Sequence, residues 1–424
     1  MNDMDTFNDK QAFLAVLYNK DVWNLIRGYM YPGKKSANWY DWNGDGDTAA
    51  FYGFLSLMKE RPKLRYTSSS AEFAAERGDF EMLFWLRRVN KSKLFMKKTM
   101  DFAARGGQLE MVKWLHENGF PCTKNAMDCS AGNGHLEVVK FLHENRKEGC
   151  TKVAFGQAIY NGHLHVVIWL HENRTEGFPR QSPDQAAQRG HLDVVKFLHE
   201  NRKEKFSKRA VDLAAESGNI EMVRWLLENR KEGCTSDAMD FASINGDLEL
   251  LKLLHQKKKR CSEEALEAAS SKGHIEIVRW LLEVRNEECT ANAIDLASSY
   301  GQFEIVKYLH ENGKPCTHQA LNGASYGGYI EIVKFLHFNR TEGCTEDAMD
   351  FAAGKGYLEI VKFLHENRTE GCTPWAMYEA SRRGFLDVVK FLFENRTEGV
   401  VEECYEIARV YQNPQVMEYL KSRF

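Results

Sequence analysis

The chain has 424 residues, and its 57 lysines and arginines against 60 aspartates and glutamates leave a net charge of −3 at pH 7. This balance argues against a dominant electrostatic attraction to nucleic acid or to an anionic membrane, which needs a large excess of one sign. No run of about 18 apolar residues occurs, so we expect no membrane-spanning helix. We therefore expect neither nucleic acid nor membrane among the partners.

The first residues, MNDMDTFNDK, have neither a basic start nor an apolar core, so no signal peptide is expected. We expect an intracellular, cytoplasmic protein with reduced thiols. The basic run KKKR at 257–260 leaves a nuclear address open as an alternative to a solvated loop.

Residues 11–30, QAFLAVLYNKDVWNLIRGYM, place apolar side chains at helical spacing. This pattern predicts one or two amphipathic helices that cap the rest of the chain. The alternative is an adaptor helix resembling an F-box, which would recruit a ubiquitin ligase. The segment lacks the Leu-Pro opening of that family.

The stretch DWNGDGDTAAFY at 41–52 resembles a calcium-binding EF-hand loop over residues 41–47. Its twelfth position, which should carry a bidentate glutamate, is Tyr52. The simpler interpretation is that Asp47 or Thr48 caps a helix that begins at Ala49, with the glycines making the turn. We expect no metal and no other cofactor, and calcium stays the alternative.

A glycine recurs every 27 to 29 residues along most of the chain, and a fixed period of this kind indicates a solenoid of stacked repeats. Twelve such glycines precede a segment like LEIVKFL: Gly78, Gly107, Gly134, Gly162, Gly190, Gly218, Gly246, Gly273, Gly301, Gly328, Gly356 and Gly384.

Each repeat predicts two helices, as residues 345–366, TEDAMDFAAGKGYLEIVKFLHE, illustrate. Thr345 is a candidate N-cap, and small apolar residues follow at helical spacing. Gly356 ends this helix as a residue able to adopt positive φ. The second helix is apolar over more than half of its circumference, so it must pack from two sides.

The segment AGNGHLEVVKFLHEN at 131–145 resembles the core of the ankyrin repeat, and the resemblance covers about residues 65 to 424. It implies an all-α solenoid of about twelve helix pairs. The period is shorter than the 33 residues of ankyrin repeats. We therefore expect shortened or absent β-hairpin fingers. Such short variants resemble arrays found in protists and giant viruses.

The array has degenerate ends, as expected for repeats with a single neighbour. Residues 51–67 align without gaps to 357–373 and predict an isolated second helix. Near the other end, Gln412 replaces the glycine and Pro414 the leucine. We expect an N-terminal helical cap over 1–60 and a repeat array over 61–424.

The motif NRTEGC and its variants contain histidines and cysteines that could suggest a chemical site. Where the cysteine is absent, the position holds Phe95, Phe178, Phe206 or Tyr66, which predicts a buried apolar slot. The preceding histidine alternates with leucine and phenylalanine, which predicts packing. Eight cysteines share the position: Cys122, Cys150, Cys234, Cys261, Cys289, Cys316, Cys344 and Cys372.

The resemblance implies a protein–protein interaction scaffold without catalytic activity, and we expect protein partners. The partner surface should lie where repeats depart from their own pattern. Ile168 replaces a charged residue, and later repeats carry Tyr, Trp and Arg, the residues that dominate binding energy. The candidates are Ile168, Tyr300, Tyr326, Phe338, Trp375, Tyr378, Arg382 and Arg383. The alternative is that some of them pack against the C-terminal cap.

A basic cluster formed by NRKEKFSKRA (201–210), Arg180 and Arg189 is a further candidate contact for a phosphate or an acidic partner.

Overall fold

A computed structural model describes residues 45–90, 97–203, 206–257 and 260–423. These residues form 28 helices and no β-strand. The predicted all-α class and the absence of hairpin fingers from the described repeats are therefore confirmed.

Twelve helix pairs make up the described array, as predicted, and one further pair lies at each end, the N-terminal one being shorter. The first helices of the pairs are α5 (Ser68–Arg77), α7 (Lys97–Arg105), α9 (Lys124–Gly132), α11 (Lys152–Tyr160), α13 (Ser182–Arg189), α15 (Arg209–Glu216), α17 (Asp237–Asn245), α19 (Glu264–Lys272), α21 (Asn292–Ser299), α23 (His318–Gly327), α25 (Asp347–Lys355) and α27 (Pro374–Arg383).

The second helices are α6 (Phe80–Asn90), α8 (Leu109–Glu117), α10 (Leu136–Asn145), α12 (Leu164–Asn173), α14 (Leu192–Asn201), α16 (Ile220–Asn229), α18 (Leu248–Gln256), α20 (Ile275–Glu283), α22 (Phe303–Glu311), α24 (Ile330–Asn339), α26 (Leu358–Asn367) and α28 (Leu386–Asn395). The end pairs are α3 (Gly46–Phe51) with α4 (Leu55–Glu60), and α29 (Val401–Val410) with α30 (Pro414–Lys421).

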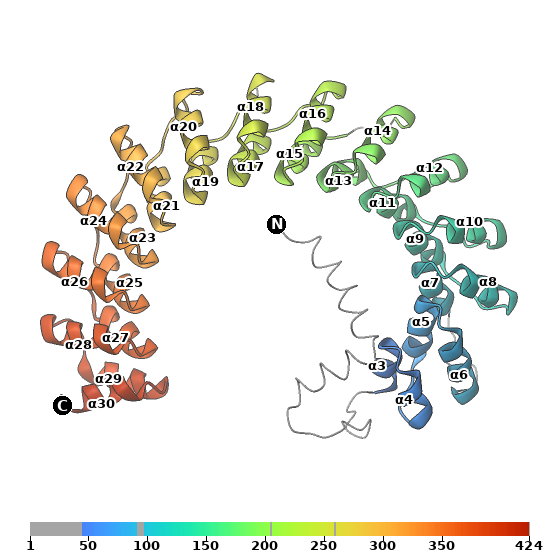
Figure 1. The fold of residues 1–424 in the computed structure, drawn as a ribbon, viewed down its shortest axis with the longest axis horizontal. Helices are drawn as coiled ribbons and strands as arrows, with labels where there is room; N and C mark the ends of the chain where they lie inside the picture. The colour runs from blue at the N-terminus through green and yellow to red at the C-terminus, as the bar shows by residue number, and fades with distance from the viewer. Residues whose placement is uncertain (1–44, 91–96, 204–205, 258–259, 424) are drawn as a thin grey trace. The chain divides into compact units, whose positions relative to one another are not determined.

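The chain divides into two compact units. Unit 1 comprises the residues up to Ala158 together with 165–178. Unit 2 comprises 159–164 together with the residues from Pro179 onward. Within unit 2, the first helices α13 to α27 follow one side of the stack and the second helices follow the other (Figure 1). Successive first helices pack closely because they carry alanines such as Ala352 and Ala353, both fully buried. Larger side chains such as Val361 fill the space between the two rows.

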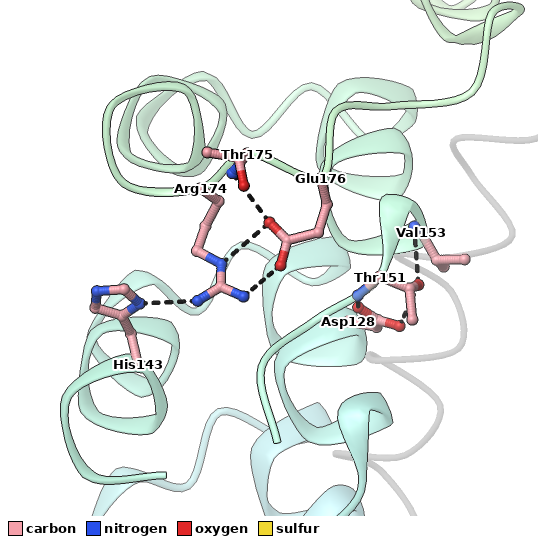
Figure 2. Close-up of polar contacts among 7 residues, drawn as sticks. All are labelled: Asp128, His143, Thr151, Val153, Arg174, Thr175 and Glu176. Carbon is pink, nitrogen blue, oxygen red and sulfur yellow. Dashed lines mark hydrogen bonds and ion pairs between the residues drawn. The ribbon is translucent and has the colours of Figure 1, made fainter. Parts of the chain in front are cut away.

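Successive repeats are joined by a hydrogen-bonded contact between their first helices, which we call the rung. In it, a side chain of one first helix accepts hydrogen bonds from the Thr or Ser at the start of the next. In unit 1, Asp128 on α9 accepts hydrogen bonds from the backbone N–H of Thr151, at 2.7 Å, and from its hydroxyl, at 2.7 Å. The Thr151 hydroxyl then accepts a bond from the N–H of Val153 and so caps α11 (Figure 2). One carboxylate thus fixes both the spacing of two helices and the start of the second.

The same rung recurs along both units, with conservative changes of side chain. Its members are Asp47–Thr67, Asp101–Thr123, Asp128–Thr151, Asp184–Ser207, Asp212–Thr235, Asp240–Ser262, Glu267–Thr290, Asp295–Thr317, Asn322–Thr345 and Asp350–Thr373.

The NRTEGC motif folds into a turn held by its own arginine and glutamate. Arg174 pairs with Glu176, whose carboxylate also accepts the N–H of Thr175 at 3.1 Å (Figure 2). The Arg174 guanidinium lies 3.2 Å from Nδ1 of His143 in the preceding repeat. The ring of that histidine meets Trp169 edge-on. The motif therefore connects neighbouring repeats, and the packing role predicted for the histidine is confirmed.

The cysteine position is an apolar slot, as predicted. Cys122, Cys150, Cys316 and Cys372 are buried, the other four at this position are half-buried, and all ten cysteines of the chain are free thiols. Burial raises the pKa of the Cys372 thiol to about 11, which keeps it protonated at neutral pH.

The N-terminal end differs from the prediction in two places. Helix α3 begins at Gly46, three residues before Ala49, and its cap is Asp45, which accepts the N–H of Thr48 at 2.8 Å. Helix α4 begins only at Leu55, because Gly53 takes positive φ just before it. Residues 11–30 and 41–44 lie outside the described residues, so the cap over 1–60, the adaptor helix and the calcium loop stay predictions.

No helix among the described residues is both long and apolar enough to cross a bilayer.

The glycine that ends each first helix generates a prediction at Gly246. Its φ is +77°, and a Cβ added there would lie 2.7 Å from Cε1 of His274. Gly246→Val should cost about 1–2 kcal/mol, because a β-branched residue is strained in this conformation and also meets the ring. Hydrogen exchange should increase only in the adjoining repeats, since a solenoid couples nearest neighbours.

Gly218→Val is the matched control for this change. Gly218 has φ +69° but no atom within 4 Å of the added Cβ. It should therefore show the backbone strain alone and a smaller loss of stability. Equal losses, or exchange rising evenly over residues 45–423, would contradict the prediction.

The buried rung carboxylate Asp350 predicts a pH dependence. Burial raises its pKa to about 6, although hydrogen bonds from Thr373 oppose the shift. Because the unfolded chain loses this proton first, the contribution of Asp350 to stability falls as pH rises from about 4 to about 6. Asn322 already makes the same rung, accepting the Thr345 N–H at 3.1 Å and donating to its hydroxyl at 2.7 Å. Asp350→Asn should keep the rung and remove this fall.

Urea unfolding of the wild type and of Asp350→Asn between pH 4 and 7 measures the effect. We expect the difference in unfolding free energy to move in favour of the variant by on the order of 1 kcal/mol across this range. Asp387→Asn, at an exposed carboxylate of α28, serves as the control. Parallel curves for wild type and Asp350→Asn would show that burial of this charge has no such cost.

Candidate protein-interaction surface

Three aromatic side chains form a row along the first helices of the last repeats in unit 2. Tyr326 on α23 meets Phe351 on α25 with ring centroids 5.5 Å apart, and Phe351 meets Trp375 on α27 at 6.3 Å, both edge-on. Tyr326 is 50% exposed and Trp375 is 42% exposed. We call these three residues the aromatic row. Each ring is held by its neighbour, yet two of them still face solvent.

Cations flank the aromatic row. The Lys355 ammonium lies 4.4 Å from the centre of the Tyr326 ring. About two turns after Trp375 on α27, Arg382 and Arg383 both donate to Glu379, a residue that is only 7% exposed. These hydrogen bonds, that of Arg382 first, lower the pKa of Glu379, although burial opposes the shift. Two guanidiniums share one carboxylate, so the cluster keeps an excess positive charge.

Trp375 also has a structural role. A Cβ added at Gly354 of α25 would lie 3.2 Å from its ring, so the indole lies closely against that helix. Arg382 in turn lies 5.1 Å from the ring of Tyr411 in the C-terminal pair. The predicted alternative, packing against the C-terminal cap, therefore fits Arg382, whereas the Trp375 ring packs against the preceding repeat.

The structure places the remaining candidates elsewhere. Tyr300 lies at the end of α21 and is 60% exposed. Phe338 is 70% exposed on α24, a second helix, where it packs against the rings of His337 and Phe363. Tyr378 is half-buried on α27, and Ile168 is half-buried on α12. The candidates therefore do not form one continuous site, and only Tyr326, Trp375, Arg382 and Arg383 belong to the surface around the aromatic row.

Sequence reasoning missed Phe351, Lys355 and Glu379 in this surface. Phe351 stands where Phe102 and Phe241 stand in other repeats, so no departure from the pattern marked it. Glu379 is adjacent to the rung position, which Tyr378 occupies in this repeat. A signal was present in the sequence: a glutamate three and four residues before two arginines predicts ion pairs on one helix face.

The described residues contain no group of three or more His, Cys, Asp and Glu side chains that could hold a metal ion.

A model for ankyrin repeats in three copies matches residues 155–240, 238–320 and 321–402, and a model for ankyrin repeats in many copies matches 100–143 and 129–171. Helical pairs with short turns and a matching family model define a repeat-solenoid protein. The chain belongs to the ankyrin-repeat family. Ankyrin repeats form protein–protein interaction modules, and proteins built from them are typically non-enzymatic scaffolds. A comparison with curated proteins found no match.

Two solved structures that align with the chain are of the pentatricopeptide repeat protein PPR10 from maize. One aligns at 12% identity and TM-score 0.36 over 86% of this chain and 64% of PPR10. The other is a complex of PPR10 with an 18-nt psaJ RNA element and aligns at 10% identity and TM-score 0.40, over 88% and 68%. The chain therefore spans about two thirds of the proteins it aligns with.

The exclusion of nucleic acid from the partners is corrected by this comparison, because a helical-repeat structure in RNA complex is among those that align. The physical error lies in using the net charge. In an extended repeat array, charge of one sign can gather locally while the whole chain stays near neutral.

Proposed function

We propose that this ankyrin-repeat protein is a non-enzymatic scaffold that holds a protein partner against the aromatic row and its flanking cations. The proposal rests on one observation: two aromatic rings are exposed to solvent and yet held in place. Tyr326 and Trp375 face solvent, while Phe351 and Gly354 fix their positions. Rings that are already ordered lose little conformational entropy on binding. Tyr, Trp and Arg are also the residues that most often dominate interface energies.

The absence of catalysis is part of this proposal. The groups that could act as nucleophile or base recur in most repeats and serve packing there. Burial raises the pKa of the Cys150 thiol to about 11, whereas a nucleophilic cysteine needs a lowered pKa. The histidine of the same motif, His143, is engaged by Arg174. An intracellular, reducing compartment also suits the ten free cysteines.

The double variant Tyr326→Ala, Trp375→Ala tests the proposed surface. The full chain and its variants would be used for affinity purification from extracts of the source cells, with quantitative mass spectrometry of the captured proteins. We expect a defined subset to fall at least tenfold with the double variant, since each side chain at an interface centre contributes about 2 kcal/mol or more. Melting should change little, by about 1 kcal/mol of stability, because both rings are half-exposed.

Phe338→Ala is the matched control, because Phe338 is more exposed but lies on the second-helix row. It should leave capture by the aromatic row unchanged. Retained capture by the double variant, together with a lowered melting temperature, would make the aromatic row structural and would refute the proposed surface.

A further inference from the structure

The first turns of the first helices carry charges whose sign separates along the chain. In unit 1 these positions hold Lys98, Lys124 and Lys152, on α7, α9 and α11, and no acidic residue occupies the first turns of these helices. All three lysines are exposed. We call these three residues the basic edge. The first two repeats of unit 2 continue the positive sign with exposed Arg180, Lys208 and Arg209.

From α17 onward the same positions are negative or neutral, and no lysine or arginine occurs at them. We call the exposed acids at these positions the acidic edge of unit 2. They lie on α17, α19, α25 and α29 or at their N-caps: Asp237, Glu263, Glu264, Glu346, Asp347, Glu402 and Glu403.

Helix stability explains only one of the two edges. The N-terminus of a helix carries a partial positive charge, so acidic residues in the first turn stabilise it and lysines do not. The acidic edge therefore needs no further reason. The basic edge runs against this preference in three successive repeats of unit 1, so the helix dipole does not account for its charges.

The described part of the chain leaves both edges without ion pairs, although Lys98 acts on two nearby carboxyls: burial raises the pKa of Glu72 and of Asp101, and the charge of Lys98 opposes both shifts. The exposed Glu–Lys pairs of the second helices, such as Glu137–Lys140 at 2.8 Å, show that charges elsewhere on the surface do pair. The arginine of each NRTEGC turn pairs as well, as Arg230 does with Glu232 at 2.6 Å. By contrast, no lysine of the basic edge and no carboxylate of the acidic edge forms an ion pair with another described residue.

We propose that the basic edge of unit 1 binds the acidic edge of unit 2 of a second copy of this chain. The two edges occupy the same positions of the repeat, and the acids of α17 and α19 lie one repeat apart, as neighbouring lysines of the basic edge do, so two successive charges of each edge can pair in register. Charge complementarity at this shared spacing favours the second copy over an unrelated acidic partner, whose carboxylates would have no reason to match the spacing of the repeats. This association is independent of the aromatic row.

Sedimentation velocity of the full chain over a range of concentrations up to about 100 µM tests the proposal. The mean mass should rise with concentration at about 25 mM NaCl and return to that of the monomer at about 500 mM, because salt screens exposed charges. The triple variant Lys98→Glu, Lys124→Glu, Lys152→Glu has two acidic edges. The triple variant Asp237→Lys, Glu264→Lys, Asp347→Lys has two basic edges. Each alone should weaken association at least about tenfold.

An equimolar mixture of these two variants should associate again, because an acidic edge then meets a basic one. The control Lys147→Glu, Lys203→Glu, Lys231→Glu makes the same change in net charge as the Lys98, Lys124 and Lys152 variant, but at exposed loop positions, and should leave association unchanged. Circular dichroism and melting verify that each variant is folded.

Several results would overturn the proposal. They are a monomer under all conditions, equal weakening by the loop control, or no association in the mixture of folded variants. Binding of a labelled poly-uridine RNA of about 20 nucleotides is measured as well, to test whether the basic edge binds nucleic acid. Binding of this RNA that is lost with the Lys98, Lys124 and Lys152 variant, without any self-association, would assign the basic edge to nucleic acid instead.

Discussion

The rung between an acidic side chain and the Thr or Ser of the following repeat is the interaction on which the rest of the array depends. It replaces the register that a longer repeat could obtain from a hairpin finger. Asp212, for example, accepts both the N–H and the hydroxyl of Thr235, at 2.9 and 3.0 Å. A buried carboxylate is costly unless its oxygens are satisfied. This cost makes the rung specific, because only a correctly placed N-cap residue offsets it.

The positions at which the rung is missing are informative. Gly156 stands at the carboxylate position and has no side chain, and Pro179 stands at the N-cap position and has neither an N–H nor a hydroxyl. The chain divides into its two units between these residues. At the other end, Tyr378 and Val401 occupy the rung positions, and the array ends one pair later. The residue choice at two positions therefore coincides with the organisation of the chain.

Much of the fold follows from the sequence because its signals are local. The glycine period, the alanine stripe and the alternation of cysteine with aromatic residues each report on one helix and its immediate neighbours, and the structure bears them out. The rung could not be found in this way, since Asp350 and Thr373 are 23 residues apart on different helices. The start of α3 was misjudged for a related reason: Asp45, Asp47 and Thr48 are all good N-caps. Asp47 instead accepts the N–H of Thr67, the N-cap residue of α5, at 2.8 Å.

The candidate surface was only partly predictable. A residue that departs from the repeat pattern can be found in the sequence, but the pattern does not show which residues of neighbouring repeats lie beside it. Trp375 and Phe338 both depart from the pattern, yet one lies on a first helix and the other on a second helix. Conversely, Phe351 follows the pattern but becomes part of the surface because its neighbours Tyr326 and Trp375 are aromatic. Membership in a surface depends on the residues at equivalent positions in adjacent repeats.

The same rung explains why the first turn can carry functional charge. Thr373 caps α27 through its hydroxyl and is itself fixed by Asp350, so the helix start does not depend on the two residues that follow. Those residues are Pro374 and Trp375 here, Lys152 and Val153 in unit 1, and Glu263 and Glu264 in unit 2. A capping contact supplied by the preceding repeat makes a few tenths of a kcal/mol of unfavourable helix-dipole energy tolerable at Lys124 and Lys152. The two positions that follow the Thr or Ser of the rung are therefore those at which the surface residues of the array can change with the smallest loss of stability.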